Sequence, residues 1–366
     1  MNSSDTRIGV PKVAAEISAT WLTSALKAGG ADLTVTDLMV EPIGVGVGIM
    51  SLVYRLTPTY DGTIGPKSFV VKIAPPWEQI RSIAAGYGFY NREVEIYRNL
   101  APRLGLRPPT CYYGEFISDT DEFVVVIDDL GHLRSLDQLD GCPVDDARLI
   151  IESLARHHAT WWGDPTLFEL SYIQTAATPP WPQFNDQGFK QSWPVILERG
   201  GDLVPERVRA VGERWSDVGP VIMRKMANHK LTLIHGDVRL DNVFFHDDGG
   251  DPVSIIDWQI ANIGIGTFDL AYFISQSMTV EDRREHLEDL LALYHATLVA
   301  NGVSDYTIAE MWHDFRMCVL FCLTYPVLGG AGELANARAL QLVRSMLERT
   351  VQTIIDTDAD ELIGSL

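Results

Sequence analysis

Apolar residues alternate with polar ones along much of the first third of the chain and recur at steps of three and four residues along most of the rest. Alternation is typical of β-strands with one buried face, whereas the longer steps are typical of helices that pack on one side. The predicted strands comprise two within residues 35–60 and one each over residues 68–73, 110–117 and 123–127. A short helix over 17–28 and a main helix over 88–104 accompany them. The first 130 residues therefore predict a five-stranded antiparallel lobe with one main helix.

Helical spacing dominates after Gly131, where we place a hinge. The predicted helices cover residues 145–162, 281–300, 308–328 and 334–355. At 366 residues the chain is longer than one hydrophobic core usually serves. We therefore expect an α+β protein with two lobes, residues 1–130 and residues 131–366, of which the second is mostly helical.

The charge balance narrows the range of partners. The chain has 29 Lys and Arg residues against 49 Asp and Glu residues, a formal net charge of -20. This charge repels the phosphates of nucleic acids and anionic membranes, so neither is expected as a partner. An acidic surface suits a cationic ligand, but it also simply aids solubility. The sequence leaves the oligomeric state open.

Cysteine usage and the lack of long apolar runs indicate a cellular compartment. The cysteines lack CxxC spacing and are predicted to be buried thiols, which fits a reducing environment. They are Cys111, Cys142, Cys318 and Cys322. The first residues contain no apolar core of signal-peptide length, and no run of about eighteen apolar residues occurs. We therefore expect a soluble, cytoplasmic protein.

The candidate chemistry is concentrated within residues 231–273. A short apolar run leads into His-Gly-Asp ending at Asp237, Asn242 follows five positions later, and a second apolar run leads into Asp257. Phosphoryl transfer from a nucleotide needs an Asp to orient the acceptor hydroxyl and oxygen ligands to hold magnesium. Asp237 fits the first role, and Asn242 and Asp257 fit the second. Each residue alone could simply cap a turn, but all three in this order favour the chemical interpretation.

The pattern HGDxxxxN, followed by IDW and a DLA segment, resembles the aminoglycoside phosphotransferase and choline kinase group. The DWQ ending, the pair Tyr294-His295 and the segment DLAYF over 269–273 are closer still to its ecdysteroid-kinase-like branch. The resemblance implies a two-lobed, protein-kinase-like fold that uses ATP and Mg²⁺ to phosphorylate a hydroxyl of a small molecule. It makes Asp237 the catalytic base. Aminoglycoside, choline-like, sterol and sugar-like acceptors all remain open.

A lone lysine, Lys72, stands inside the apolar run of the third predicted strand. Burying an unpaired ammonium is costly, so it needs an acidic partner, which either Glu93 or Glu95 on the next helix could supply. The resemblance, through an E-x-x-x-Y pattern ending at Tyr97, points to Glu93 and makes Lys72 the lysine that holds the nucleotide phosphates. The alternative is an edge-strand lysine that reaches solvent.

Two further segments could bind the nucleotide. A glycine-rich turn ahead of the lysine strand would let backbone amides approach phosphates, although its G-x-G-x-G spacing also suits a plain hairpin. The resemblance implies that backbone carbonyls just before the hinge face the adenine. The candidates in these segments are Gly44, Gly46, Gly48, Ser51, Asp128 and Leu130.

The acceptor-binding residues are less clear. Residues 163–200 are rich in Pro, Trp and Gln and are predicted to be irregular, and such loops often carry binding. We expect Trp181, Phe184 or Trp193 to contribute to the acceptor pocket. Asp269 has two interpretations: the resemblance implies that it stabilises the catalytic loop, and a simple helix N-cap explains it equally well.

Two alternative functions and one alternative site complete the predictions. A catalytically inactive nucleotide-binding scaffold, a pseudokinase, has the same fold, but such a protein usually lacks one of the polar residues present here. A protein kinase is disfavoured, because only 11 residues separate Asp257 from Asp269 and leave little room for a peptide-docking loop. The pair His157-His158 suggests a metal, but neighbours on a helix point in different directions, so structural histidines are predicted.

Overall fold

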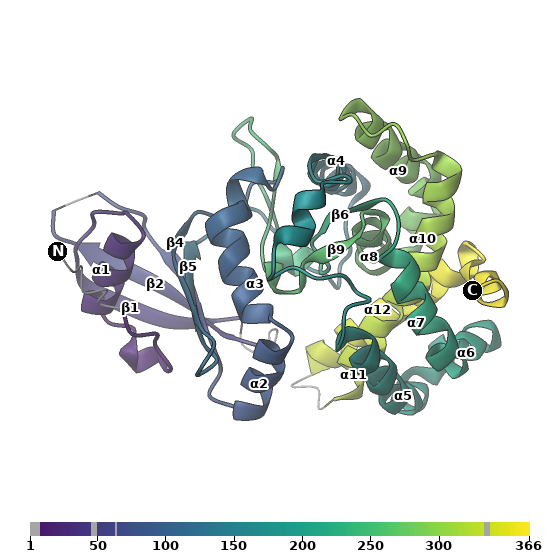
Figure 1. The fold of residues 1–366 in the computed structure, drawn as a ribbon, viewed down its shortest axis with the longest axis horizontal. Helices are drawn as coiled ribbons and strands as arrows, with labels where there is room; N and C mark the ends of the chain where they lie inside the picture. Colours follow the sequence, from purple (N-terminus) through teal and green to yellow (C-terminus); the bar gives the residue numbers. More distant parts are fainter. Residues whose placement is uncertain (1–7, 45–49, 63, 333–336) are drawn as a thin grey trace. The chain divides into compact units, whose positions relative to one another are not determined.

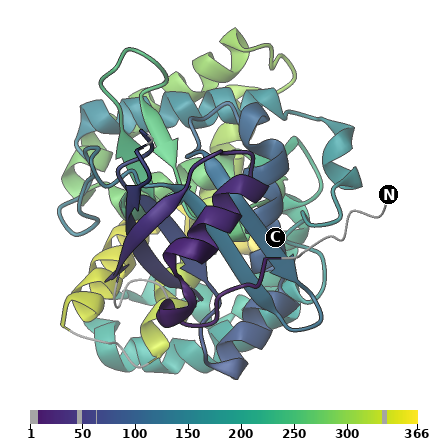
Figure 2. The same ribbon diagram turned by 90° about the vertical axis from the view of Figure 1, so that its left-hand side faces the viewer.

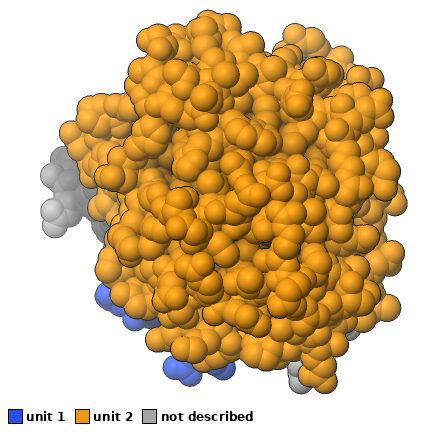
Figure 3. All heavy atoms as spheres, turned by 90° about the vertical axis from the view of Figure 1, so that its right-hand side faces the viewer, with its two compact units in different colours: residues 1–102, 108–132 blue, residues 103–107, 133–366 orange. Residues whose placement is uncertain are grey.

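The computed structural model describes residues 8–44, 50–62, 64–332 and 337–366. The chain divides into two compact units, unit 1 with residues 1–102 and 108–132, and unit 2 with residues 103–107 and 133–366 (Figure 3). The predicted boundary between two lobes, after residue 130, stays a prediction. The α+β class is confirmed: unit 1 contains an antiparallel sheet, and unit 2 is mostly helical.

The sheet of unit 1 has five antiparallel strands, as predicted. Their order is β1-β2-β3-β5-β4. The strands are β1 (Val35–Ile43), β2 (Leu52–Tyr60), β3 (Phe69–Ile73), β4 (Cys111–Ile117) and β5 (Glu122–Asp128). Strand β3 is central, because Lys72 stands opposite Val53 on one side and Val125 on the other. Lys72 is therefore not an edge-strand lysine.

Helices cover both faces of this sheet (Figures 1 and 2). Helix α1 (Ala19–Ala28) packs Leu22 and Leu26 into one core with Val71 of β3. On the other face lie α2 (Glu78–Gly86) and α3 (Phe89–Glu95), where Tyr90 stacks on Phe123 at 4.7 Å between ring centroids. Because successive strand residues point to opposite faces, Lys72 faces α3. The predicted helix over 88–104 exists, but it continues from α3 as a π-helix (Ile96–Leu100) and a 3-10 turn (Ala101–Arg103).

Unit 2 is built around α8, whose residues are all buried. Its helices are α4 (Val144–Thr160), α5 (Trp181–Gly200), α6 (Glu206–Glu213), α7 (Trp215–Met226), α8 (Thr267–Ser277), α9 (Val280–Ala300), α10 (Ile308–Cys322), α11 (Thr324–Ala331) and α12 (Ala337–Asp356). Two small antiparallel pairs complete it: β6 (Leu231–Ile234) with β9 (Asn262–Ile265), and β7 (Val243–Phe245) with β8 (Val253–Ile255). The predicted helices of this part of the chain are therefore present, except that the one over 308–328 is divided into α10 and α11.

The prediction that residues 163–200 are irregular is wrong for their second half, which forms the 20-residue helix α5. Pro182 stands in the first turn, where its missing N–H costs nothing. Farther along, Phe189 stacks on Trp215 at 4.5 Å and on Trp193 at 5.4 Å. Trp193 is 6% exposed and belongs to this aromatic core, so we withdraw it from the acceptor pocket. Tertiary packing overrides the local signals here.

Two observations concern the cysteines and the long apolar stretch near the C-terminus. All four cysteines are free, and three of them are buried. The stretch Ile308–Ala331 is long and apolar enough to cross a membrane by length and composition alone, but 72% of its apolar window is buried inside the structure. Such burial is typical of a core helix.

Candidate active site

The segment 235–242 follows β6 and carries Asp237 and Asn242; we call it the catalytic loop after its predicted role. It begins with a sharp turn at Gly236, whose φ is 87°. A Cβ atom at this position would lie 2.9 Å from the carbonyl oxygen of Ile260. Both the positive φ and the close approach require glycine. This explains why a glycine stands where protein kinases have the arginine of their HRD motif.

His235 braces the loop through both ring nitrogens. Its Nδ1 accepts from the backbone N–H of Asp237 at 3.1 Å, so the ring proton is on Nε2, which donates to the carbonyl oxygen of Ile256 at 3.0 Å. The ring also packs edge-on against Trp258, with 4.6 Å between the centroids. His235 thus ties the segment that carries Asp237 to the segment that leads into Asp257.

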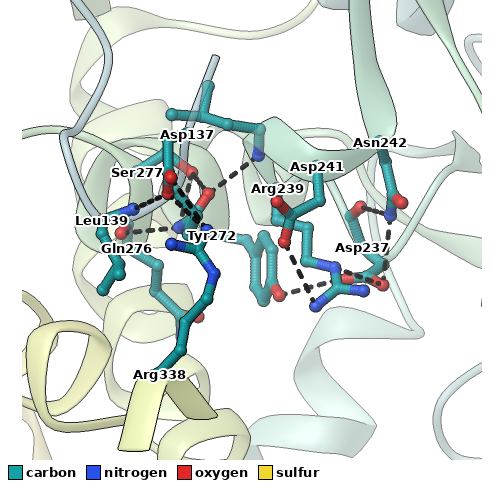
Figure 4. Close-up of polar contacts among 12 residues, drawn as sticks. Asp137, Leu139, Asp237, Arg239, Asp241, Asn242, Tyr272, Gln276, Ser277 and Arg338 are labelled. Atoms are coloured by element: carbon teal, nitrogen blue, oxygen red, sulfur yellow. Dashed lines mark hydrogen bonds and ion pairs between the residues drawn. The ribbon is translucent and has the colours of Figure 1, made fainter. Parts of the chain in front are cut away.

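The carboxylate of Asp237 is held at both oxygens (Figure 4). The buried hydroxyl of Tyr272 donates to Oδ1 at 2.7 Å. On the other side, the Nδ2 of Asn242 lies 3.3 Å from Oδ2 and also donates to the backbone oxygen of Asp237 at 3.0 Å. The Asp237 side chain remains 16% exposed. Its orientation is therefore fixed while part of it stays accessible.

Arg239 places a positive charge beside this carboxylate. Its Nε lies 3.7 Å from Asp237 Oδ2, and its Nη1 lies 3.7 Å from Asp241 Oδ2. Within the part of the chain that the structure describes, Nε is buried without a hydrogen-bond partner. Burial opposes the charge, but the neighbouring carboxylates, Asp237 foremost, raise the pKa of Arg239. Burial also raises the pKa of Asp241.

Asn242 and Asp257 are brought together by the backbone. The N–H of Ile256 donates to the carbonyl oxygen of Asn242 at 2.9 Å, and Asp257 is the next residue. Asp257 adopts a left-handed conformation with φ of 71°, which is rare for a non-glycine residue and typical of functional sites. Because the Nδ2 of Asn242 is directed to Asp237, its amide oxygen is the atom that could ligate a cation.

These donors suit magnesium. Mg²⁺ prefers oxygen ligands and usually takes one or two carboxylates plus substrate phosphates, so an amide oxygen and a carboxylate suffice. The described residues contain no cluster of three or more His, Cys, Asp and Glu side chains that could hold a metal alone. The site therefore fits an ion that is shared with a phosphate ligand.

Asp269 anchors the start of the catalytic loop from α8. Its carboxylate accepts from the backbone N–H groups of His235 at 2.7 Å and Gly236 at 2.8 Å, and from Nε2 of His158 at 3.1 Å. Burial alone would raise the pKa of Asp269, but these hydrogen bonds outweigh it and lower the pKa. Asp269 is therefore a loop anchor, as the resemblance implied, and the N-cap alternative is wrong.

The adjacent histidines have different structural roles. His158 links Asp269 to the hydroxyl of Tyr294, which lies 2.8 Å from its Nδ1. The Nδ1 of His157 contacts the carbonyl oxygen of Leu104, and its buried Nε2 has no partner among the residues described. Burial lowers the pKa of His157 to about 3, so its ring is neutral.

His157 should make unit 2 sensitive to acid. Its pKa falls from 6.5 to about 3 on folding, so protonation favours the unfolded chain. The stability that the neutral ring provides is complete above pH 6.5 and is lost as the pH falls toward 3. The unfolding free energy should decrease by about 1.4 kcal/mol more per pH unit in the wild type than in His157→Gln. Urea unfolding across this range measures the two slopes, and equal slopes would contradict the assignment.

In unit 1, Lys72 pairs with Glu93 and not with Glu95. The Nζ of Lys72 lies 2.6 Å from Oε1 of Glu93, and the two residues are 7% and 1% exposed. Glu95 instead accepts from Nδ2 of Asn99 at 2.5 Å on the exposed side of the helix. The buried ammonium therefore has the charged partner that the sequence required.

The other nucleotide-binding candidates have mixed outcomes. Gly44 follows β1 with φ of 65°, and Ser51 directly precedes β2. Gly46 and Gly48 lie outside the described residues. The Asp128 carboxylate is engaged in the sheet, where the N–H of Thr110 and the hydroxyl of Tyr112 each donate to it at 2.8 Å. The side chain of Asp128 is therefore occupied. Its predicted role, and that of Leu130 just beyond β5, is that a backbone carbonyl faces the adenine.

Three residues of the site were missed by sequence reasoning. Tyr272 holds Asp237 and stands one helical turn after Asp269, so an i, i+3 pattern in the DLAYF segment could have indicated it. Tyr325 donates to the carbonyl oxygen of Gly236 at 2.8 Å, 89 positions away. Gln138 accepts from the N–H of Leu240, 102 positions away. No local signal marks Tyr325 or Gln138.

Solved structures of an aminoglycoside phosphotransferase and a choline kinase have the same fold, which confirms the predicted protein-kinase-like class. An uncharacterized kinase-like protein of Caenorhabditis elegans is 22% identical over 226 residues, which cover 58% of this chain and only 57% of that protein. The GDP complex of aminoglycoside 2'-phosphotransferase-IIIa is 16% identical over 92% of this chain and 99% of that chain, with a TM-score of 0.53. Choline kinase from Cryptosporidium parvum Iowa II is 11% identical over 90% of each chain, with a TM-score of 0.55. At these identities the two structures show the fold alone.

The family follows from a match that covers more than half of the chain. Residues 46–303 match the family model, a stretch that includes β3, α3, the catalytic loop and α8. Except for Tyr325, the polar residues described above lie within it. The chain belongs to the ecdysteroid kinase-like family.

Proposed function

We propose that the protein transfers the γ-phosphoryl group of ATP to a hydroxyl group of a small molecule. The observation that carries the proposal is the environment of Asp237. Its carboxylate is oriented by Tyr272 and Asn242 and remains partly accessible, beside the segment that carries Asp257. This is the arrangement that phosphoryl transfer needs, because catalysis of this reaction depends mostly on positioning and charge stabilisation.

Asp237 is the base in this proposal. It orients the acceptor hydroxyl and takes up its proton as the new bond from oxygen to the γ-phosphorus forms. The bond from that phosphorus to the oxygen bridging to the β-phosphate breaks, and the nucleoside diphosphate leaves. Arg239 stays charged 3.7 Å from Asp237 and can stabilise negative charge on the group in transfer.

The cofactors are ATP and magnesium. Asn242 and Asp257 would hold the ion, which when bound neutralises charge on the phosphates. Lys72, kept in place by Glu93, would bind the nucleotide phosphates. The backbone at Gly44 and Ser51 would cover them, and the backbone at Asp128 and Leu130 would meet the base.

The acceptor is a small hydroxylated molecule. The net charge of -20 supports an acceptor other than a nucleic acid or a membrane surface. The free cysteines support a cytoplasmic location. Trp181 and Phe184, in the first turn of α5, remain our candidates for acceptor contacts.

Changing Trp181 to Ala should weaken acceptor binding while the KM for ATP stays the same.

Nucleotide consumption against a panel of hydroxylated compounds tests the proposal. The panel should contain aminoglycosides, amino alcohols, sterols and sugars, with ATP and GTP run in parallel. Consumption that depends on one acceptor class and on Mg²⁺ is expected, with the phosphorylated product identified by its mass. Nucleotide binding without consumption against any compound would favour the pseudokinase instead.

A further inference from the structure

The catalytic loop contains a buried backbone donor that the loop itself does not satisfy. Leu240 opens the 3-10 turn Leu240–Asn242 and is 0% exposed. The first N–H groups of such a turn have no acceptor within the turn. In the described chain, the preceding residue, Arg239, does not cap the turn with its side chain. An unsatisfied N–H at this point would destabilise the turn that carries Asn242.

Gln138 provides the missing acceptor. Its Oε1 accepts from the N–H of Leu240 at 2.8 Å. Its Nε2 donates to the carbonyl oxygen of Gln276 at 2.9 Å and lies 3.2 Å from Oγ of Ser277, both at the end of α8. All three side chains are buried. The contacts with α8 determine which end of the amide faces Leu240, so Gln138 acts as a remote N-cap.

The backbone around Gln138 is held by the C-terminal helix, α12. We refer to residues 137–142 as the strap. The Nη1 of Arg349 donates to the carbonyl oxygen of Gln138 at 2.7 Å, and its Nη2 donates to that of Leu139 at 2.8 Å. Arg349 also donates to the carbonyl oxygen of Gln276 at 3.1 Å and is 8% exposed. One guanidinium therefore fixes the strap to the end of α8.

A second contact joins α12 to the strap at the surface. The Nη2 of Arg338 donates to both carboxylate oxygens of Asp137, at 2.7 and 2.8 Å. Figure 4 shows Asp137 and Arg338 on one side of Tyr272, and Asp237 with Asn242 on the other. Helix α12 thus contacts the strap from its first turn, through Arg338, and from its second half, through Arg349.

We propose that Gln138 and Arg349 are positioning residues that set the conformation of the turn carrying the metal ligand Asn242. Gln138 acts through the N–H of Leu240, two positions before Asn242, and Arg349 acts through the backbone of Gln138. The proposal rests on the proposed function, because its consequence is a change in metal binding and turnover. It assigns a role to a helix that lies beyond residues 46–303, which match the family.

Substitution of Gln138 tests the cap in the full chain. Gln138→Ala should increase hydrogen exchange in residues 235–242 while α10 exchanges as in the wild type. The MgCl₂ concentration for half-maximal nucleotide consumption should rise roughly ten- to a hundredfold, the usual loss when a contact behind a metal ligand is removed. Gln138→Glu keeps an acceptor for Leu240, but it buries a negative charge and loses the donor to Gln276, so it should also raise the Mg²⁺ requirement.

Substitution of Arg349 tests the second step. Arg349→Lys keeps the charge but cannot reach three carbonyl oxygens at once, so it should raise the Mg²⁺ requirement in the same direction. Arg344→Ala is the matched control, because Arg344 is an α12 arginine that binds the carbonyl oxygen of Arg199 and the carboxylate of Asp202, away from the strap. It should behave as the wild type.

The two proposals fail in different ways. If the wild type consumes no nucleotide with any acceptor, the proposed function fails, and the hydrogen exchange of residues 235–242 still decides whether Gln138 holds the loop. If the wild type is active, unchanged exchange and an unchanged Mg²⁺ requirement in Gln138→Ala would overturn the positioning role.

Discussion

Replacing Asp237 with asparagine is expected to lower kcat by roughly 10²–10⁴-fold, the usual contribution of a positioned base. Asparagine has the same shape, and its Oδ1 can still accept from the hydroxyl of Tyr272, which now lies 2.7 Å from the carboxylate. It cannot take up the proton of the acceptor hydroxyl. The KM for the nucleotide should therefore change little, and steady-state kinetics with a saturating acceptor measure both constants.

Asp247→Asn is the matched control, because Asp247 is an exposed residue beyond β7. It removes the same charge from the same unit without touching the catalytic loop, so it should keep the wild-type kcat. An Asp237→Asn enzyme that turns over at the wild-type rate would show that Asp237 is not the base.

The second large effect is expected for Asp269→Asn. The carboxylate of Asp269 is fully buried and receives two backbone N–H groups and His158. An amide brings hydrogens of its own toward these donors and removes the negative charge that they stabilise. The free energy of unfolding should fall by about 1–3 kcal/mol for each of these donors that is left without an acceptor. Activity should fall with it, because the loop start loses its anchor.

Asp305→Asn controls for the loss of an acidic residue in the same unit. Asp305 contacts Lys230 at 2.7 Å, but its side chain is 62% exposed, so its loss should cost only about 0–1 kcal/mol. Urea unfolding at neutral pH compares the two variants. If Asp269→Asn were as stable as Asp305→Asn, the anchor role of Asp269 would be wrong.

The parts of the site that lie close together in sequence could be predicted from it. Asp237 and Asn242 share one short loop, and an apolar run of strand length leads into each segment of the window 231–273. The sequence offered Glu93 and Glu95 as partners of Lys72, and the resemblance pointed to Glu93. The structure buries Glu93 against Lys72, whereas Glu95 contacts Asn99. Local pattern thus defines candidates, and packing selects among them.

The remaining site residues depend on long-range packing. Gln138 and Arg349 are 211 positions apart, and each belongs to a segment with no motif of its own. Their roles arise because α8 and α12 pack together and present carbonyl oxygens and one buried N–H that need partners. The same reasoning applies to α5, where internal Pro194 and a Pro-rich start argue against a helix that the aromatic core stabilises.

The loop that carries Asp237 is held by contacts from several elements. Asp269 of α8 fixes its start, Gln138 fixes its turn, and His235 joins it to the end of β8. A loop with these restraints needs little rearrangement when charge develops, which is how preorganised sites lower a barrier. This physical property connects the hydrogen-bond network to the proposed reaction.

The most direct test of the account is a stoichiometric one. ATP consumed and phosphorylated acceptor formed should be measured together, by ³¹P NMR and mass spectrometry, for the wild type and Asp237→Asn with and without Mg²⁺. We predict one phosphorylated molecule per ATP, formed only by the wild type and only with the ion. Release of inorganic phosphate without a phosphorylated acceptor, or equal product from the Asp237→Asn enzyme, would contradict the account.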